Sequence, residues 1–190
     1  MSRKILGAAL ALSALSAPAL AGEKFPLDPG HTSIYFIHGH FGFSKMIGRF
    51  NESSGEIDFE KDNIPASKVK VVIKAASIDT NHAKRDDHLR SPDFFNVKEF
   101  PEITFVSTGI EKTGERSGKL MGNLTMVGVT KPVVLDASFN KDDISPPSKK
   151  FTIGFSARGK IKRSDFGMKY GVPNLGDELE MLIETEAMRP

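Results

Sequence analysis

Hydrophobic and polar residues alternate with a period of two along most of the chain after residue 30. In the last such segment Leu179, Met181 and Ile183 share one face, while glutamates occupy the other. One apolar and one polar face is typical of antiparallel strands that separate a core from water. The alternation and the turn residues together predict about eight strands, at 33–41, 47–59, 68–77, 102–112, 119–127, 130–140, 150–162 and 178–187.

The segment from Asp79 to Phe100 is charged and lacks the alternation. Asn81 is suited to cap a short helix that ends at Leu89. Ser91 followed by Pro92 is a second start signal, since serine caps helices and proline suits the first helical position. We therefore predict a short helical segment near 81–98.

An antiparallel sheet with one apolar face has to cover that face, and eight strands suit a closed barrel. The predicted fold is thus an all-β, eight-stranded antiparallel barrel. Such a barrel is either filled by side chains or holds one small ligand. The pattern leaves both alternatives open, because the predicted inner faces mix large residues with small ones: Ala75, Gly122, Ala137, Ala157, Gly159 and Ala187.

The N-terminus has the features of a secretory signal peptide. Arg3 and Lys4 precede an apolar run that is too short to span a membrane, and Ala19-Leu20-Ala21 has the small residues of a cleavage site. We expect cleavage after residue 21 and export to the periplasm. Residues 22–190 then form a single domain.

Charge and cysteine content exclude several classes of function. The chain has 26 basic and 24 acidic residues, and loss of Arg3 and Lys4 leaves a mature chain with no formal net charge. A nucleic-acid-binding protein would show a basic surplus on one face, so no nucleic-acid partner is predicted. The chain has no cysteine, which excludes disulfides, thiolate metal sites and a cysteine nucleophile.

The histidines were considered as metal ligands and as catalytic groups. His38 and His40 lie two residues apart with His31 nearby, but no acidic residue has a matching ligand spacing. His88 follows Asp87 in a charged segment that contains no known nucleophile motif. We interpret these side chains as polar surface groups and predict neither a metal site nor a catalytic residue.

Several blocks in order along the chain carry a family resemblance. They include Leu27-Asp28-Pro29-Gly30-His31-Thr32-Ser33, the run Arg85-Asp86-Asp87-His88-Leu89-Arg90-Ser91-Pro92-Asp93-Phe94-Phe95, and Ile161-Lys162-Arg163-Ser164-Asp165-Phe166-Gly167-Met168. The chain resembles the YceI-like family of polyisoprenoid-binding periplasmic proteins over essentially its whole mature length. The resemblance implies a lipocalin-like barrel, an apolar tunnel and a bound isoprenoid lipid or quinone, and it is compatible with dimers and a link to stress responses. It implies no catalytic residues and no required cofactor.

Residues were assigned to this expected site from the alternation and the matching blocks. The predicted tunnel lining is Phe36, His38, Phe94, Phe105, Leu124, Met126, Phe155, Phe166 and Met168. The predicted contacts to the lipid headgroup are polar residues at strand ends: His88, Arg90, Arg163 and Asp165. The expected partner is one polyisoprenoid or quinone lipid, with transient membrane contact and a homodimer as further expectations.

The sequence leaves two alternatives to a lipid carrier. The first is an enzyme that modifies a lipid in the same cavity, which would need a polar cluster inside the barrel. The second is a ligand-free stress or interaction protein with a filled core.

Overall fold

The computed structural model describes residues 22–190, and the predicted signal peptide at 1–21 lies outside the described residues. It contains one α-helix, α1 (Ala83–Leu89), and four short 3₁₀ helices, η1 (Pro29–His31), η2 (Ile64–Ala66), η3 (Ala75–Ser77) and η4 (Arg163–Phe166). The strands are β1 (Glu23–Pro26), β2 (Ser33–His40), β3 (Ser44–Phe50), β4 (Ser53–Phe59), β5 (Lys68–Lys74), β6 (Ile78–Asp79), β7 (Glu102–Lys112), β8 (Ser117–Met126), β9 (Val129–Ile144), β10 (Phe151–Lys162) and β11 (Glu178–Met188).

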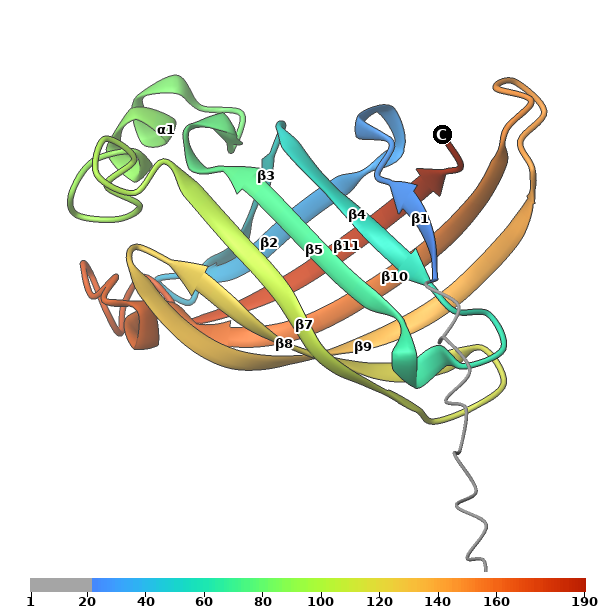
Figure 1. Ribbon diagram of the computed structural model, residues 1–190. Coiled ribbons are helices and arrows are strands. Elements are labelled where there is room, and N and C mark those ends of the chain that lie inside the picture. The colour runs from blue at the N-terminus through green and yellow to red at the C-terminus, as the bar shows by residue number, and fades with distance from the viewer. Residues whose placement is uncertain (1–21) are drawn as a thin grey trace, which may run out of the picture.

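The strands form one antiparallel sheet that curls around a central core (Figure 1). Their order is β1-β4-β5-β7-β8-β9-β10-β11-β2-β3-β6. Most neighbours in this order are also consecutive strands of the chain, which is the expected result of hairpin connections. The predicted all-β antiparallel fold with a short helix is confirmed.

The predicted number of eight strands is too low, since the described residues form eleven. The segment 47–59 is two strands that separate at Asn51 and Glu52 and pair with different partners, β3 with β2 and β4 with β5. No glycine or proline marks this bend, so the alternation seemed continuous. β1 and β6 have four and two residues, and strands that short leave little periodic signal.

The N-terminal segment joins two parts of the curled sheet. β1 pairs with β4, and the next residue, Leu27, forms an isolated bridge with Ala187 of β11. Asp28 N–H then donates to the Glu186 carbonyl at 2.8 Å. We call this contact of Leu27–His31 with β11 the closing seam. Phe25 and Ala187 are almost fully buried beneath it, which stabilises the seam through apolar burial.

The segment between β6 and β7 covers one end of the barrel, which we call the capped end (Figure 1). Its helix is α1 alone, with His82 as N-cap, and the predicted second helix after Ser91 is a series of turns. Asn81 adopts a positive φ of 60°, which asparagine tolerates, and this turn leaves the capping position to His82. Phe95 is buried and packs edge-on against Phe50 at 5.5 Å between ring centroids.

Candidate functional site

The barrel interior holds a cavity of about 360 Å³ between the capped end and the opposite end. Its wall is formed mainly by apolar side chains from β4, β5, β7, β8, β9, β10 and β11. Apolar lining residues include Ile57, Val71, Phe105, Leu124, Leu135, Ala157, Met181 and Ile183. The sequence left open whether the barrel is filled by side chains or hollow, and the structure favours a barrel with an internal cavity.

Small residues in the wall leave room for this cavity. Gly118, Ala137 and Ala157 line it and are direct neighbours across β8, β9 and β10. Gly122 makes room for the Phe105 ring, because a Cβ atom at this position would lie 2.3 Å from that ring. With glycine at this position the ring packs closely against the opposing strand and leaves the centre of the barrel free.

Three aromatic rings of the cavity wall, those of Phe59, Phe139 and Phe155, contact one another. Phe59 stacks on Phe139 at 5.8 Å between ring centroids, and Phe155 approaches the two rings at 5.7 and 5.4 Å. Such pairs in tilted and stacked arrangements contribute beyond simple burial. The Arg116 guanidinium lies 5.2 Å from the Phe139 ring centroid, so a cation adjoins this aromatic group.

We define the mouth of the cavity by its charged lining residues, which are Lys61, Lys112, Glu115 and Arg116. They lie in or beside the β4–β5 and β7–β8 turns, at the opposite end of the barrel from α1 (Figure 1). Lys61 forms an ion pair of 2.6 Å with Asp142. Arg116 donates from Nε to the Phe139 carbonyl at 3.2 Å. With Asp142 counted, three cations face two acids, so the mouth keeps a small positive charge, and Lys112 and Arg116 are the cations that Asp142 does not neutralise.

The structure places three of the nine predicted tunnel residues on the cavity wall: Phe105, Leu124 and Phe155. Four others, Phe36, Met126, Phe166 and Met168, are buried in the packed core. These four residues share the apolar interior with the cavity wall but do not line this cavity, and their contact with a lipid stays a prediction. A period of two identifies the inner face of a strand, but not the depth at which the packing stops.

Phe94 and His38 also lie away from the cavity lining. Phe94 packs at the capped end against His88 and Tyr170, at 5.1 and 5.3 Å between ring centroids. His38 is half-buried, and its Nδ1 lies 2.9 Å from the Gly39 carbonyl. Burial lowers the pKa of His38 from its ordinary value, the hydrogen bond with the Gly39 carbonyl opposes this shift, and the positive charge of Arg163 adds to it.

The four predicted headgroup residues lie at the capped end, and none of them lines the cavity in the described structure. His88 forms a hydrogen bond with Asp93, with 2.9 Å between His88 Nε2 and a carboxylate oxygen. Arg90 donates to the carbonyls of Ala76 and Ile78. Asp165 belongs to η4 beside these groups. The cavity has its charged lining residues at the opposite end, so a headgroup role for these four residues stays a prediction.

Arg163 has a structural environment that its sequence did not reveal. It is only 5% exposed, and burial lowers the pKa of its guanidinium. The guanidinium donates four hydrogen bonds of 2.6–2.9 Å to backbone carbonyls of the loop between η4 and β11, those of Met168, Tyr170, Leu175 and Gly176. It thereby satisfies carbonyls that would otherwise lack partners.

The fold and the cavity define a class of protein: a curled antiparallel barrel with an apolar interior that is open at one end. The YceI-like domain model matches residues 25–187, and the chain belongs to the YceI-like family. A UPF0312 protein of Photorhabdus laumondii is 42% identical over 181 residues, covering 95% of this chain and 93% of that protein.

Solved structures show the same fold. The YceI protein of Campylobacter jejuni is 39% identical, with a TM-score of 0.71 over 80% of this chain and 90% of that one. A polyisoprenoid-binding domain from Saccharophagus degradans has a TM-score of 0.68 at 16% identity, and the match covers 87% of this chain and 98% of that domain. These likenesses confirm the predicted family and its lipocalin-like fold.

Proposed function

We propose that this protein binds one long apolar isoprenoid lipid, a polyprenyl chain or an isoprenoid quinone, in the barrel interior and carries it through the periplasm. The observation that carries the proposal is the apolar cavity, which opens to solvent at one charged mouth. Membership in the YceI-like family and the fold shared with a polyisoprenoid-binding domain support it.

The physical reason for such a carrier is the cost of exposing an isoprenoid tail to water. Each buried CH₂ contributes about 0.8 kcal/mol, so a long tail leaves a membrane only if a protein covers it. Ligand cavities commonly measure about 300–1,000 Å³, and the present one lies near the lower limit. We expect a long tail to displace the rings of Phe59, Phe139 and Phe155 or to extend past the mouth.

Export to the periplasm is part of the same proposal and rests on the N-terminal sequence alone. Within residues 22–190 no helix is long and apolar enough to cross a membrane. Fractionation of cells, with N-terminal sequencing of the purified protein, would test export and the expected cleavage after residue 21 together.

The alternative of a lipid-modifying enzyme has less support from the cavity. A general base must lie within hydrogen-bond reach of the reacting atom. Among the described lining residues, the charged side chains are the exposed ones at the mouth, and the interior wall offers hydroxyl groups such as those of Thr32, Thr185 and Ser156. We therefore favour binding without chemical change.

The decisive experiment is mass spectrometry of an organic extract from the purified, exported protein. A stoichiometric isoprenoid lipid or quinone of unchanged structure is the expected result. A modified lipid after incubation would favour the enzyme. A clean extract, together with no uptake of offered quinone or polyprenyl phosphate, would overturn the proposal in favour of a ligand-free interaction protein.

The electropositive mouth predicts a preference for anionic headgroups. We expect the double substitution of Lys112→Ala with Arg116→Ala to weaken binding of a polyprenyl phosphate about tenfold relative to a neutral quinone. A hydrogen bond to a charged group contributes about 1.5–3 kcal/mol, whereas the tail contacts are unchanged. Titration of both lipids by fluorescence competition measures the ratio.

The matched control is Lys119→Ala, which removes an exposed lysine of β8 that pairs with Asp136. An equal loss of affinity for both lipids would show that the mouth contributes to structure rather than to headgroup preference. If His88→Ala changes the preference between the two lipids and the double substitution at Lys112 and Arg116 does not, the lipid enters at the capped end.

Contact with a membrane is also proposed, through the hairpin that joins β2 and β3 at the capped end. Phe43 is 90% exposed, Phe41 51% and Ile47 58%, with Lys45 between them. Exposed apolar groups next to a basic side chain suit the interface of an anionic bilayer. We expect Phe41→Ser with Phe43→Ser to reduce sedimentation with phosphatidylglycerol-containing vesicles at least tenfold.

Val134→Ser is the control, because Val134 is similarly exposed at 52% but lies on the outer face of β9. The expected homodimer is tested in the same samples by light scattering. If the double substitution at Phe41 and Phe43 dissociates a dimer and leaves vesicle binding unchanged, the hairpin is an interface between two copies instead.

A further inference from the structure

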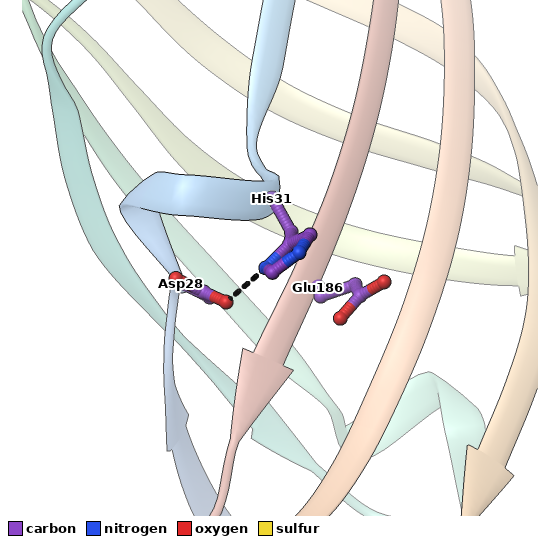
Figure 2. A group of neighbouring side chains, drawn as sticks. All are labelled: Asp28, His31 and Glu186. Atoms are coloured by element: carbon purple, nitrogen blue, oxygen red, sulfur yellow. Dashed lines mark hydrogen bonds and ion pairs between the residues drawn. The ribbon is translucent and has the colours of Figure 1, made fainter. Parts of the chain in front are cut away.

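The closing seam brings together three side chains of the kind that bind metals. Asp28 and His31 come from the segment that precedes β2, and Glu186 comes from β11, 155 residues after His31 in the chain. One ligand atom from each residue lies within 4.8 Å of the other two. Figure 2 shows the Asp28 and His31 side chains meeting in front of β11, with the Glu186 carboxylate beside the imidazole.

The local backbone holds these groups in place. Asp28 is the N-cap of η1, and its Oδ1 accepts the Gly30 N–H at 2.9 Å. Its Oδ2 lies 2.5 Å from His31 Nδ1, and its own N–H donates to the Glu186 carbonyl. All three residues are thus tied to the seam by their main chains or by each other, and an ion would meet a largely preformed group.

The charges of the group suit a cation. The carboxylates of Asp28 and Glu186 both lie within 4.8 Å of the His31 imidazole. With a neutral imidazole the group carries two negative charges, which a divalent ion would neutralise.

A second hollow of about 310 Å³ lies beside the group and supplies space for further ligands. His31 and Glu186 both line it, together with the polar residues Asp143, Ser145, Thr152 and Glu184. Its wall is more polar than that of the lipid cavity, and it also includes Lys141, which pairs with Asp143 at 2.9 Å. Water molecules or one of these oxygen atoms would complete a four-coordinate site.

We propose that Asp28, His31 and Glu186 bind a divalent transition-metal ion of the zinc class, which links the N-terminal segment to the last strand across the closing seam. One imidazole nitrogen with two carboxylate oxygens suits zinc and its neighbours better than calcium or magnesium, which prefer all-oxygen sites. Ligand bonds of about 2.0–2.2 Å would place the ligand atoms roughly 3.3 Å apart in tetrahedral geometry. The ligand atoms now lie within 4.8 Å of one another, so binding an ion would draw them closer together.

The site would stabilise the barrel, because its ligands meet only in the folded chain. An ion that binds only the folded state at a hundredfold excess over its Kd raises the melting temperature by about 5 °C or more for a domain of this size. The metal site would form whether or not a lipid is bound, because its ligands do not line the lipid cavity. Their sequence neighbours Thr32 and Thr185 do line that cavity, and they form a hydrogen bond of 2.8 Å with each other.

The test is a thermal melt of the purified protein, without a polyhistidine tag, in EDTA and then with Zn²⁺ alone. We expect a rise of about 5 °C with Zn²⁺, none with Mg²⁺, and 1:1 binding by calorimetry. His31→Gln and Glu186→Gln should each weaken Zn²⁺ binding at least tenfold. His40→Gln and Glu178→Gln are the controls, a histidine elsewhere and an exposed carboxylate at the other end of β11.

A direct spectroscopic measurement keeps the proposal testable if a variant is unstable. Co²⁺ bound by one nitrogen and oxygen ligands absorbs in the visible range, and displacement by Zn²⁺ removes this absorption. The proposal is overturned by three outcomes: no shift of the melting temperature with Zn²⁺, unchanged binding in both His31→Gln and Glu186→Gln, or an equal loss in the His40→Gln control.

Discussion

Ala157→Phe is expected to reduce lipid uptake at least tenfold while the barrel remains folded. Ala157 of β10 lines the cavity and lies directly between Ala137 on β9 and Ile183 on β11. A phenyl ring at this position would project into a cavity of about 360 Å³ and occupy the space of several carbon atoms of the ligand. Because the ring enters unfilled space, it replaces lipid contacts rather than protein contacts.

A measurement of thermal stability distinguishes a loss of lipid uptake caused by the added ring from one caused by unfolding. Overpacking costs about 1–3 kcal/mol in a filled core, whereas a ring that enters a cavity gains burial and leaves the melting temperature nearly unchanged. The control is Val134→Phe, which adds similar bulk to the exposed face of the neighbouring strand. Uptake of a fluorescent quinone analogue and a thermal melt of both variants are the measurements. Normal uptake by Ala157→Phe would falsify binding of the lipid in this part of the barrel.

Arg163→Ala is expected to destabilise the protein by about 3–5 kcal/mol without changing the affinity of the folded molecules for lipid. The substitution leaves four backbone carbonyls without their charged donor and removes the guanidinium, which lies 5.8 Å from the Phe94 ring centroid. Loss of one partner from a buried charged network has effects of this size. For a domain of this length the melting temperature should fall by about 10 °C.

Arg163→Lys is the informative second variant. Lysine keeps the charge, but its single ammonium cannot donate to four carbonyls in the geometry of a guanidinium, so we expect most of the loss to remain. Arg158→Ala, at an exposed position of the preceding strand β10, is the control. If Arg163→Ala retained its stability but lost selectivity between lipid headgroups, the residue would belong to the binding site and the capped end would be the entrance.

Ala157 and Arg163 show what sequence patterns can and cannot predict. The alternation around Ala157 correctly assigned it to an apolar face, because successive side chains of a strand point to opposite sides of the sheet. Arg163 follows the same strand directly, as the first residue of η4, and was interpreted as a headgroup contact, since a cation within a family motif suggests binding. Its actual partners are main-chain carbonyls, and no residue pattern encodes a hydrogen bond to a carbonyl.

The charged mouth was not predicted from the sequence for a related reason. Lys112 and Arg116 stand beside a turn of ordinary composition, which carries no motif. Their importance comes from the curvature of the sheet, which brings this turn next to Lys61 at one end of the cavity. His31 was considered as a metal ligand with His38 and His40, but its neighbour Glu186 could not be predicted, because the closing seam joins residues from opposite ends of the chain.

The sequence by itself determined the antiparallel class, the apolar inner faces of the longer strands, the position of the short helix and the family. These properties depend on local periodicity and on contiguous motifs, and both can be read along the chain. Only the tertiary structure decided where the interior is filled and where it is empty, which end is capped, and which charges surround the opening. These properties depend on side chains from several strands that meet after the sheet curls, and the volumes that meet there are not encoded in any single segment.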